Sequence, residues 1–238
     1  MKTMAIEKGS DSVTLKHASG GEVRILKYGA TIISWTSPKG STNLFLSKFI
    51  PSKSSLIGSA AKLDGSKAVR GGIPLVLLPL SLTNRRSFLY YNDLPEDKHQ
   101  VFGKSSNHPT ANLPQHGFAR TSTWRIEHEL ENSITFVLTQ EDLDAISRKL
   151  WGYEFKLTYT VELGESELKT ELEIHNPGTI GFECNALLHT YLWVQVICLL
   201  SHPTEMQNVS EIGIEGLKGL TYKDKIEGGK ANTYLYRC

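Results

Sequence analysis

The sequence has few cysteines and no paired cysteine motif. Its 238 residues include Cys184, Cys198 and Cys238, and none of the three belongs to a CxxC pair. A low, odd number of cysteines without paired spacing excludes a disulfide-stapled scaffold and a cysteine zinc site. Reduced thiols in the cytoplasm are the simplest interpretation.

Long apolar runs and a charge excess are also lacking. The longest apolar stretch, Leu192–Leu200, is interrupted by Gln195 and is far shorter than the ~20 residues of a membrane-spanning helix. The first ten residues carry charges and no apolar run, which predicts no signal peptide. The formal net charge of +1 argues against nucleic-acid binding driven by bulk charge. We therefore expect a cytoplasmic monomer without a membrane or nucleic-acid partner.

Several common catalytic motifs are missing. The sequence contains no GxSxG, no Walker A motif and no GxGxxG after a strand pattern, so neither a serine hydrolase of that type nor a nucleotide cofactor is indicated. Most of the histidines lack ligand-like spacing. These are His17, His99, His108, His128, His175 and His202. We expect no metal and no cofactor.

Alternation of apolar and polar residues dominates the remaining sequence. Short alternating runs separated by turn residues predict antiparallel strands and hairpins. The predicted strands are Ser12–Lys16, Glu22–Leu26, Ala30–Ser34, Trp124–Leu130, Ser133–Thr139, Glu154–Glu162 and Glu167–His175. Since helical periodicity is scarce, the pattern predicts an all-β chain, with one large antiparallel sandwich domain over residues 1–238.

Three segments do not fit this pattern: 47–59, 77–100 and 196–207. They begin abruptly and lack the strand periodicity of their flanks. Unstructured loops longer than about 12–15 residues are uncommon inside a compact domain. We interpret the segments either as functional lids or as sequence foreign to the fold.

The first chemical signal is Arg70-Gly71-Gly72-Ile73-Pro74. Two glycines after an arginine allow positive φ or a close approach of the backbone to a ligand. The guanidinium offers a planar fork suited to a phosphate group. The alternative is an ordinary glycine turn with a solvated arginine.

The second signal is the segment Leu113–Arg120, in which Gln115, His116 and Arg120 lie close in sequence. A histidine can donate or accept a proton near neutral pH. An amide can bind sugar hydroxyls, and an arginine can hold an anion. The alternative is a polar loop that leads into the next strand.

The third signal is His189-Thr190-Tyr191, which follows an apolar, strand-like segment. From the residues alone, a buried core histidine is the favoured interpretation of His189. Burial would lower its pKa and keep it neutral in the absence of an anionic partner.

Taken in order, these motifs resemble the glucose-6-phosphate 1-epimerase family, a branch of the aldose 1-epimerase (galactose mutarotase) superfamily. The similar stretches are Ala61–Val76, Val101–Tyr191 and Ser210–Gly229. The resemblance implies a galactose mutarotase-like β-sandwich with an open sugar-binding face. It also implies interconversion of the α and β anomers of a hexose 6-phosphate, without a metal or an organic cofactor.

The resemblance further implies roles for individual residues. His189 matches the histidine that protonates the ring oxygen. Arg70, Gln115 and Arg120 match substrate-binding positions, with the arginines facing the phosphate. His116 matches a second histidine that assists at the sugar. Ring opening needs one proton delivered to the ring oxygen and one removed from the anomeric hydroxyl, which two positioned groups can do together.

The family's general base is a Glu on late strands, after a segment with a substrate-binding Asp. This sequence ends at Cys238 without a residue that matches either. We therefore expect a sandwich that is incomplete at the C-terminus. Besides a mutarotase, a phosphosugar-binding sandwich without turnover and an inactive truncated isoform or gene-model product stay open as interpretations.

Overall fold

The computed structural model divides the chain into two compact units. One comprises Met1–Thr83 with Lys104–Trp193, and the other comprises Asn84–Gly103 with Val194–Cys238. The residues that the structure describes are 3–46, 61–80, 113, 116–193, 218–224 and 230–233. The single domain over residues 1–238 stays a prediction.

The first unit begins with a four-stranded antiparallel sheet in which neighbours in sequence pair with each other. Its strands are β1 (Ala5–Lys8), β2 (Ser12–Lys16), β3 (Glu22–Leu26) and β4 (Ile32–Thr36). The predicted pair β2–β3 is confirmed with its bounds. The third strand lies two residues later than predicted, because Gly29 and Ala30 adopt positive φ angles of 71° and 45° in the connection.

A second four-stranded antiparallel sheet follows later in the same unit. Its strands are β6 (Arg125–Leu130), β7 (Ser133–Thr139), β8 (Lys156–Leu163) and β9 (Leu168–His175). Both predicted hairpins are confirmed, since β6 pairs with β7 and β8 pairs with β9. Buried and half-buried residues alternate along the whole of β8, as expected for a strand with one face in the core.

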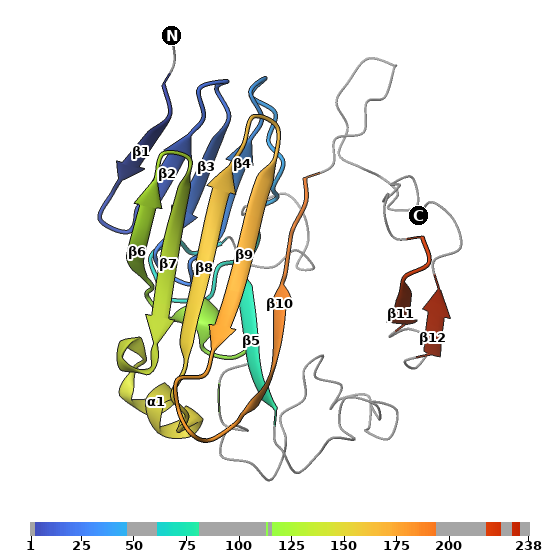
Figure 1. Ribbon diagram of the computed structural model, residues 1–238. Coiled ribbons are helices and arrows are strands. Elements are labelled where there is room, and N and C mark those ends of the chain that lie inside the picture. Colours follow the sequence, from blue (N-terminus) through green and yellow to red (C-terminus); the bar gives the residue numbers. More distant parts are fainter. Residues whose placement is uncertain are drawn as a thin grey trace, which may run out of the picture. The chain divides into compact units, whose positions relative to one another are not determined.

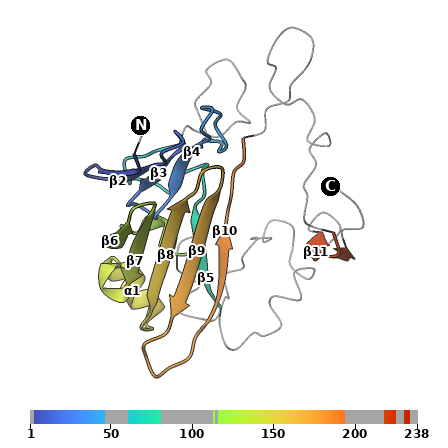
Figure 2. The same cartoon turned by 45° about the horizontal axis from the view of Figure 1, so that its top comes forward.

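The two sheets pack face to face in this unit, and Figures 1 and 2 both show β1–β4 lying against β6–β9. The core between them is built from the inward residues of both sheets, as in a β-sandwich. These residues include Val13, Leu15, Val23, Ile25, Ile134, Phe136, Leu157, Tyr159 and Val161. The predicted antiparallel sandwich is therefore confirmed.

The sequence did not predict the helix α1 (Ala145–Trp151). The carboxylate of Asp144 caps its start by accepting hydrogen bonds from the backbone N–H groups of Ile146 and Ser147, both at 2.9 Å. Gly152 ends the helix with φ 63°, and Trp151 is buried in the core. The helix closes one end of the sandwich.

A third pair of strands, β5 (Leu75–Leu80) and β10 (Glu183–Leu188), forms an antiparallel ladder. Residues 77–80 of the predicted atypical segment 77–100 therefore complete a strand. The rest of that segment, 81–100, lies outside the described residues, as do segments 47–59 and 196–207. This ladder leads directly into the candidate site.

Within the second unit, the structure describes one antiparallel hairpin, β11 (Thr221–Asp224) paired with β12 (Lys230–Thr233). The register joins Thr221 to Thr233 and Asp224 to Lys230. None of the helices in the described part of the chain has the length and apolar character needed to cross a bilayer.

Candidate functional site

Three distant segments meet in a closed ring of backbone hydrogen bonds. The N–H of Phe45 donates to the carbonyl of Tyr191 at 2.9 Å, and the N–H of Tyr191 donates to the carbonyl of Gly72 at 2.8 Å. The N–H of Gly72 donates back to the carbonyl of Phe45 at 2.7 Å. The rings of Phe45 and Trp193 stack beside this junction at 6.0 Å. The junction fixes the segments that carry Arg70 and His189.

Gly72 is required at this junction for two reasons. Its φ of 66° lies in the left-handed region that residues with a Cβ rarely adopt. A Cβ there would also overlap the carbonyl oxygen of Ile32 and come within 3.2 Å of the Cα of Ile33. Gly72 therefore serves close packing of the backbone, as the turn interpretation of this motif expects. Arg70 itself is exposed.

The second motif enters the site through a strained turn. His116 has φ 69° and Gly117 has φ 75°, and a left-handed histidine is uncommon. The chain then forms the short 3-10 helix η3 (Ala119–Thr121). Phe118 is fully buried and packs on Phe155 at a ring distance of 5.2 Å. These anchors hold His116 on one side of the helix and Arg120 within it.

The backbone of η3 is tied to the first sheet as well. The indole N–H of Trp124 donates to the carbonyl of Ala119 at 2.8 Å, and the N–H of Gly29 donates to the carbonyl of Ser122 at 2.7 Å. A Cβ on Gly29 would come within 2.6 Å of the carbonyl oxygen of Arg120. The second motif therefore packs closely against the connection that leads into β4.

The third motif follows β10, and its backbone is held by the N–H of His189, which donates to the carbonyl of Pro74 at 3.0 Å. The side chain of His189 is exposed, so the buried-core interpretation was wrong. Its ring stacks on that of Tyr191, with centroids 4.7 Å apart and planes at 27°. Because β10 ends at Leu188 and the N–H of Thr190 donates to the carbonyl of Leu188 at 3.0 Å, a tight turn at His189 lies between the strand and Tyr191.

The two candidate histidines are brought together although 73 positions separate them in sequence. The ring centroids of His116 and His189 lie 6.5 Å apart, edge to face. Burial lowers the pKa of His116, and the nearby positive charges of Arg120 and His189 lower it further. The neutral imidazole of His116 is therefore the favoured form at neutral pH, and it can accept a proton.

Arg120 is half-buried among aromatic hydroxyls. Burial lowers its pKa, and the phenols of Tyr191 and Tyr28 act in the opposite direction. The pKa of Tyr28 is raised, mainly by burial. The positive charge of Arg120 opposes this shift, and the negative charge of Asp64 adds to it. The Tyr28 ring also contacts the loop at Gly65, where a Cβ would lie 3.6 Å away. A guanidinium remains charged in such surroundings and can bind an anion.

The structure thus groups three of the five predicted residues, His116, Arg120 and His189. Arg70 lies on the exposed side of the junction, and Gln115 is outside the described residues. Tyr28 belongs to none of the three motifs, so the sequence predicts no role for it. The residues described by the structure contain no cluster of three or more His, Cys, Asp or Glu side chains that could bind a metal.

Two antiparallel sheets packed face to face place the chain among the β-sandwich proteins, and a family match is more specific. Residues 97–234, more than half of the chain, match the aldose 1-epimerase family. The chain belongs to this family.

Known proteins with similar sequence or structure point the same way. The chain is 28% identical over 233 residues to the "Putative glucose-6-phosphate 1-epimerase" of Cenchrus ciliaris, covering 92% of this chain and 54% of the relative. It matches a "putative mutarotase" structure from Salmonella typhimurium with a TM-score of 0.57 and 21% identity, over 98% of this chain and 61% of that one. A protein from Synechocystis sp. PCC 6803 matches with a TM-score of 0.52 and 18% identity, over 98% and 64%.

These structural matches establish the galactose mutarotase-like fold. The chain spans about half the length of its curated relative and under two thirds of the two solved structures.

Proposed function

We propose that the chain interconverts the α and β anomers of a hexose 6-phosphate. The observation that carries the proposal is the pair of imidazoles, His116 and His189, 6.5 Å apart, with the guanidinium of Arg120 close to His116. Two groups that transfer protons beside one cation suit a substrate with a reactive hemiacetal and an anionic end. Membership of the aldose 1-epimerase family supports the chemistry.

In the proposed mechanism His189, in its protonated form, donates its proton to the ring oxygen. Neutral His116 accepts the proton of the anomeric hydroxyl, the bond between C1 and the ring oxygen breaks, and a carbonyl forms at C1. Rotation about the C1–C2 bond and reversal of the proton transfers close the ring as the other anomer. Each positioned proton-transfer group contributes ~10²–10⁴-fold to such a rate.

The phosphate would bind Arg120, with Arg70 contributing from the exposed side of the junction and Gln115 binding sugar hydroxyls. Charge-assisted hydrogen bonds from guanidinium groups are strong and directional. They would hold the hexose against the two histidines and so reduce the entropic cost of reaching the reactive geometry.

A second candidate function is phosphosugar binding without turnover. The chain covers 54% of its curated relative. The half-buried guanidinium of Arg120 would still bind the phosphate in such a protein. The two candidates differ in whether His116 can act as the proton acceptor.

Two-dimensional exchange NMR on glucose 6-phosphate separates these functions. Cross-peaks between the α and β anomeric protons that build up faster than in buffer are expected for the active enzyme. His189→Ala should abolish the acceleration, whereas His175→Ala, a control on the exposed end of β9, should preserve it. Undiminished exchange in His189→Ala would refute the assignment. Line broadening without exchange would favour the binding protein.

We also propose that the protein acts as a cytoplasmic monomer. The cytoplasmic part rests on the three cysteines without a CxxC pair, which suit reduced thiols. Cys184 is a free, half-buried thiol whose pKa is raised by burial. Light scattering on the purified chain tests the monomer, since a mass of two chains would contradict it.

A further inference from the structure

Two turns at one end of the sandwich enclose a small cavity. The first turn continues β4, where the N–H of Ser37 donates to the carbonyl of Ser41 and the N–H of Asn43 donates to the carbonyl of Trp35, both at 2.9 Å. The second joins β8 to β9, and the N–H of Gly164 donates to the carbonyl of Glu167 at 3.0 Å. Local hydrogen bonds therefore shape both walls.

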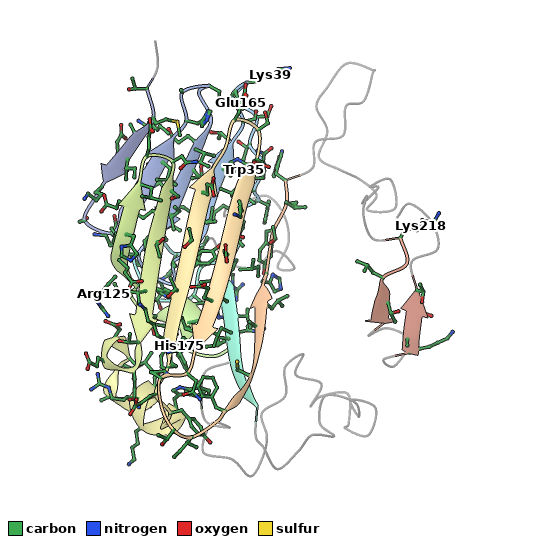
Figure 3. All side chains as sticks on the ribbon, in the orientation of Figure 1. Trp35, Lys39, Arg125, Glu165, His175 and Lys218 are labelled. Carbon is green, nitrogen blue, oxygen red and sulfur yellow. The ribbon has the colours of Figure 1, made fainter. Side chains whose placement is uncertain are left out.

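The second turn is also anchored to the opposite sheet. The hydroxyl of Ser19, in the β2–β3 turn, donates to the backbone carbonyl of Glu165 at 3.4 Å. Figure 3 shows Trp35, Lys39 and Glu165 at the same end of the unit, with His175 at the other. This contact ties the two sheets together beside the cavity, so the space between the turns is preformed.

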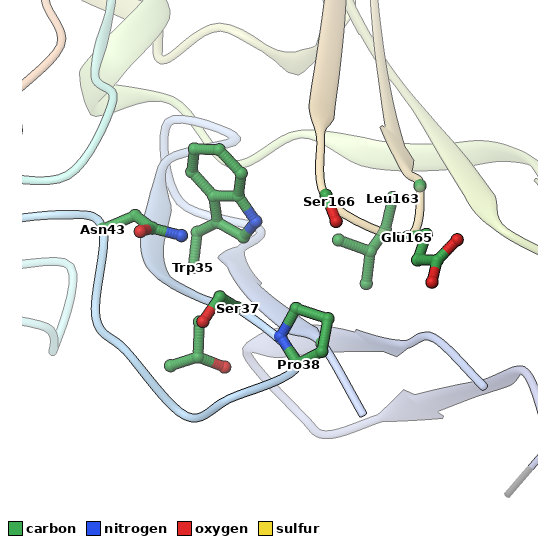
Figure 4. A pocket seen from close by; sticks show the side chains of 10 residues that line it. Trp35, Ser37, Pro38, Asn43, Leu163, Glu165 and Ser166 are labelled. Atoms are coloured by element: carbon green, nitrogen blue, oxygen red, sulfur yellow. The ribbon is translucent and has the colours of Figure 1, made fainter. Parts of the chain in front are cut away.

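We propose that this cavity, the turn pocket, binds a neutral polyhydroxylated ligand about the size of one monosaccharide ring. Its walls include Trp35, Ser37, Asn43, Leu163, Glu165 and Ser166 (Figure 4). Its volume is ≈ 150 Å³, well below the ~300–1,000 Å³ of pockets for drug-sized ligands. A nucleotide would exceed this space, whereas one pyranose ring or a smaller polyol suits it.

The chemistry of the walls favours hydroxyl groups. Trp35 is half-buried and presents an indole, against which the C–H face of a sugar ring can pack. Among the described residues, the Asn43 carboxamide, the Ser166 hydroxyl and the Trp35 indole N–H have no hydrogen-bond partner in the protein. These groups supply hydrogen-bond donors and acceptors, and a ligand hydroxyl can pair with either because it both donates and accepts hydrogen bonds.

The charge of the pocket argues against an anionic ligand. Glu165 contributes an exposed carboxylate, and none of the residues that line the pocket is a lysine or an arginine. A phosphate group would therefore meet a like charge with no cation to offset it. The candidate site at His116, His189 and Arg120 contains a cation, whereas the turn pocket contains none. The two sites share no residue. The turn pocket is a second site with a different ligand preference.

The test uses methyl α-D-glucopyranoside, a neutral sugar whose anomeric carbon is locked. Because this probe cannot change anomer, its binding is measured without turnover, and the variants distinguish the turn pocket from the site at His189. Saturation-transfer NMR should show saturable binding to the full chain. Ser166→Phe should fill the mouth of the pocket from an exposed position and weaken affinity about tenfold or more, equivalent to at least ~1.4 kcal/mol. Trp35→Ala should weaken it as well.

Two controls locate the binding. Lys39→Ala changes an exposed residue of the first turn that does not line the pocket, and affinity should be unchanged. His189→Ala should also leave it unchanged. No saturable binding to the unmodified chain, equal affinity in Ser166→Phe, or loss of binding in His189→Ala would each overturn the proposal. A melting curve on Ser166→Phe, matched to the unmodified chain, verifies that the variant folds.

Discussion

Replacing Gly72 by alanine tests whether the backbone junction holds the site together. The substitution adds a Cβ in a left-handed conformation, which costs ~1–2 kcal/mol for a residue other than glycine. The same Cβ overlaps the carbonyl oxygen of Ile32, and relief of such overpacking costs a further ~1–3 kcal/mol. The expected loss of about 2–5 kcal/mol is a large part of the ~5–15 kcal/mol that stabilises a typical domain.

Gly152→Ala is the matched control. Gly152 has φ 63°, close to the 66° of Gly72, but a Cβ there meets no atom within 4 Å. Both substitutions restrict the unfolded chain equally, so the difference between the two variants isolates the contact with Ile32. Urea unfolding followed by tryptophan fluorescence measures both free energies, because Trp124 and Trp151 are buried. Equal losses would refute the reasoning, since the junction would then tolerate a side chain.

Three further predictions concern local contacts. Asp144→Ala should destabilise the chain by ~1 kcal/mol through loss of the helix cap. Asp144→Asn should keep most of this stability, because an asparagine side chain can also cap a helix. Hydrogen bonding from Ser147 lowers the pKa of Asp144. The ionised carboxylate should therefore contribute its full share of the free energy of unfolding at pH values above the pKa of a free aspartate. This contribution should disappear as the pH falls through the lowered pKa, which urea unfolding at several pH values measures. Arg120→Ala should raise the pKa of His116, followed by NMR of its ring protons; an unchanged value would contradict the proximity. Tyr191→Leu should slow anomer exchange more than Tyr191→Phe does, because phenylalanine keeps a ring that can stack on His189. Equal rates in the two variants would exclude a role for this stacking.

The sandwich strands could be predicted because their signal is local. Along β8, apolar side chains at alternate positions face the core, and a period of two is visible in a single short segment. The helix α1 has seven residues, which is too short for a clear helical period. The ladder of β5 and β10 was missed because β5 is continuously apolar, and its partner lies about 100 positions away.

The candidate site was predictable in its residue types but not in its geometry. His116, Arg120 and His189 belong to motifs that can be read from the sequence. Their proximity depends on the backbone junction and on the positive φ of His116, neither of which has a local signal. Tyr28 could not be found, because an isolated tyrosine beside a glycine has no distinctive pattern. Its position near Arg120 arises from the pairing of residues 27–29 with residues 122–124, which are distant in sequence.

The two arginines should contribute unequally to phosphate binding, because their surroundings differ. Arg120 is half-buried beside two phenols, and a charge in a less polar environment interacts more strongly with an anion. Arg70 is exposed, so water and salt screen its charge. Arg120→Ala should therefore weaken binding of glucose 6-phosphate far more than Arg70→Ala, and more than it weakens binding of glucose. Titration calorimetry with both sugars measures the ratio. If Arg120→Ala weakened both sugars equally, the guanidinium would be positioning the ring and the phosphate would have to bind elsewhere.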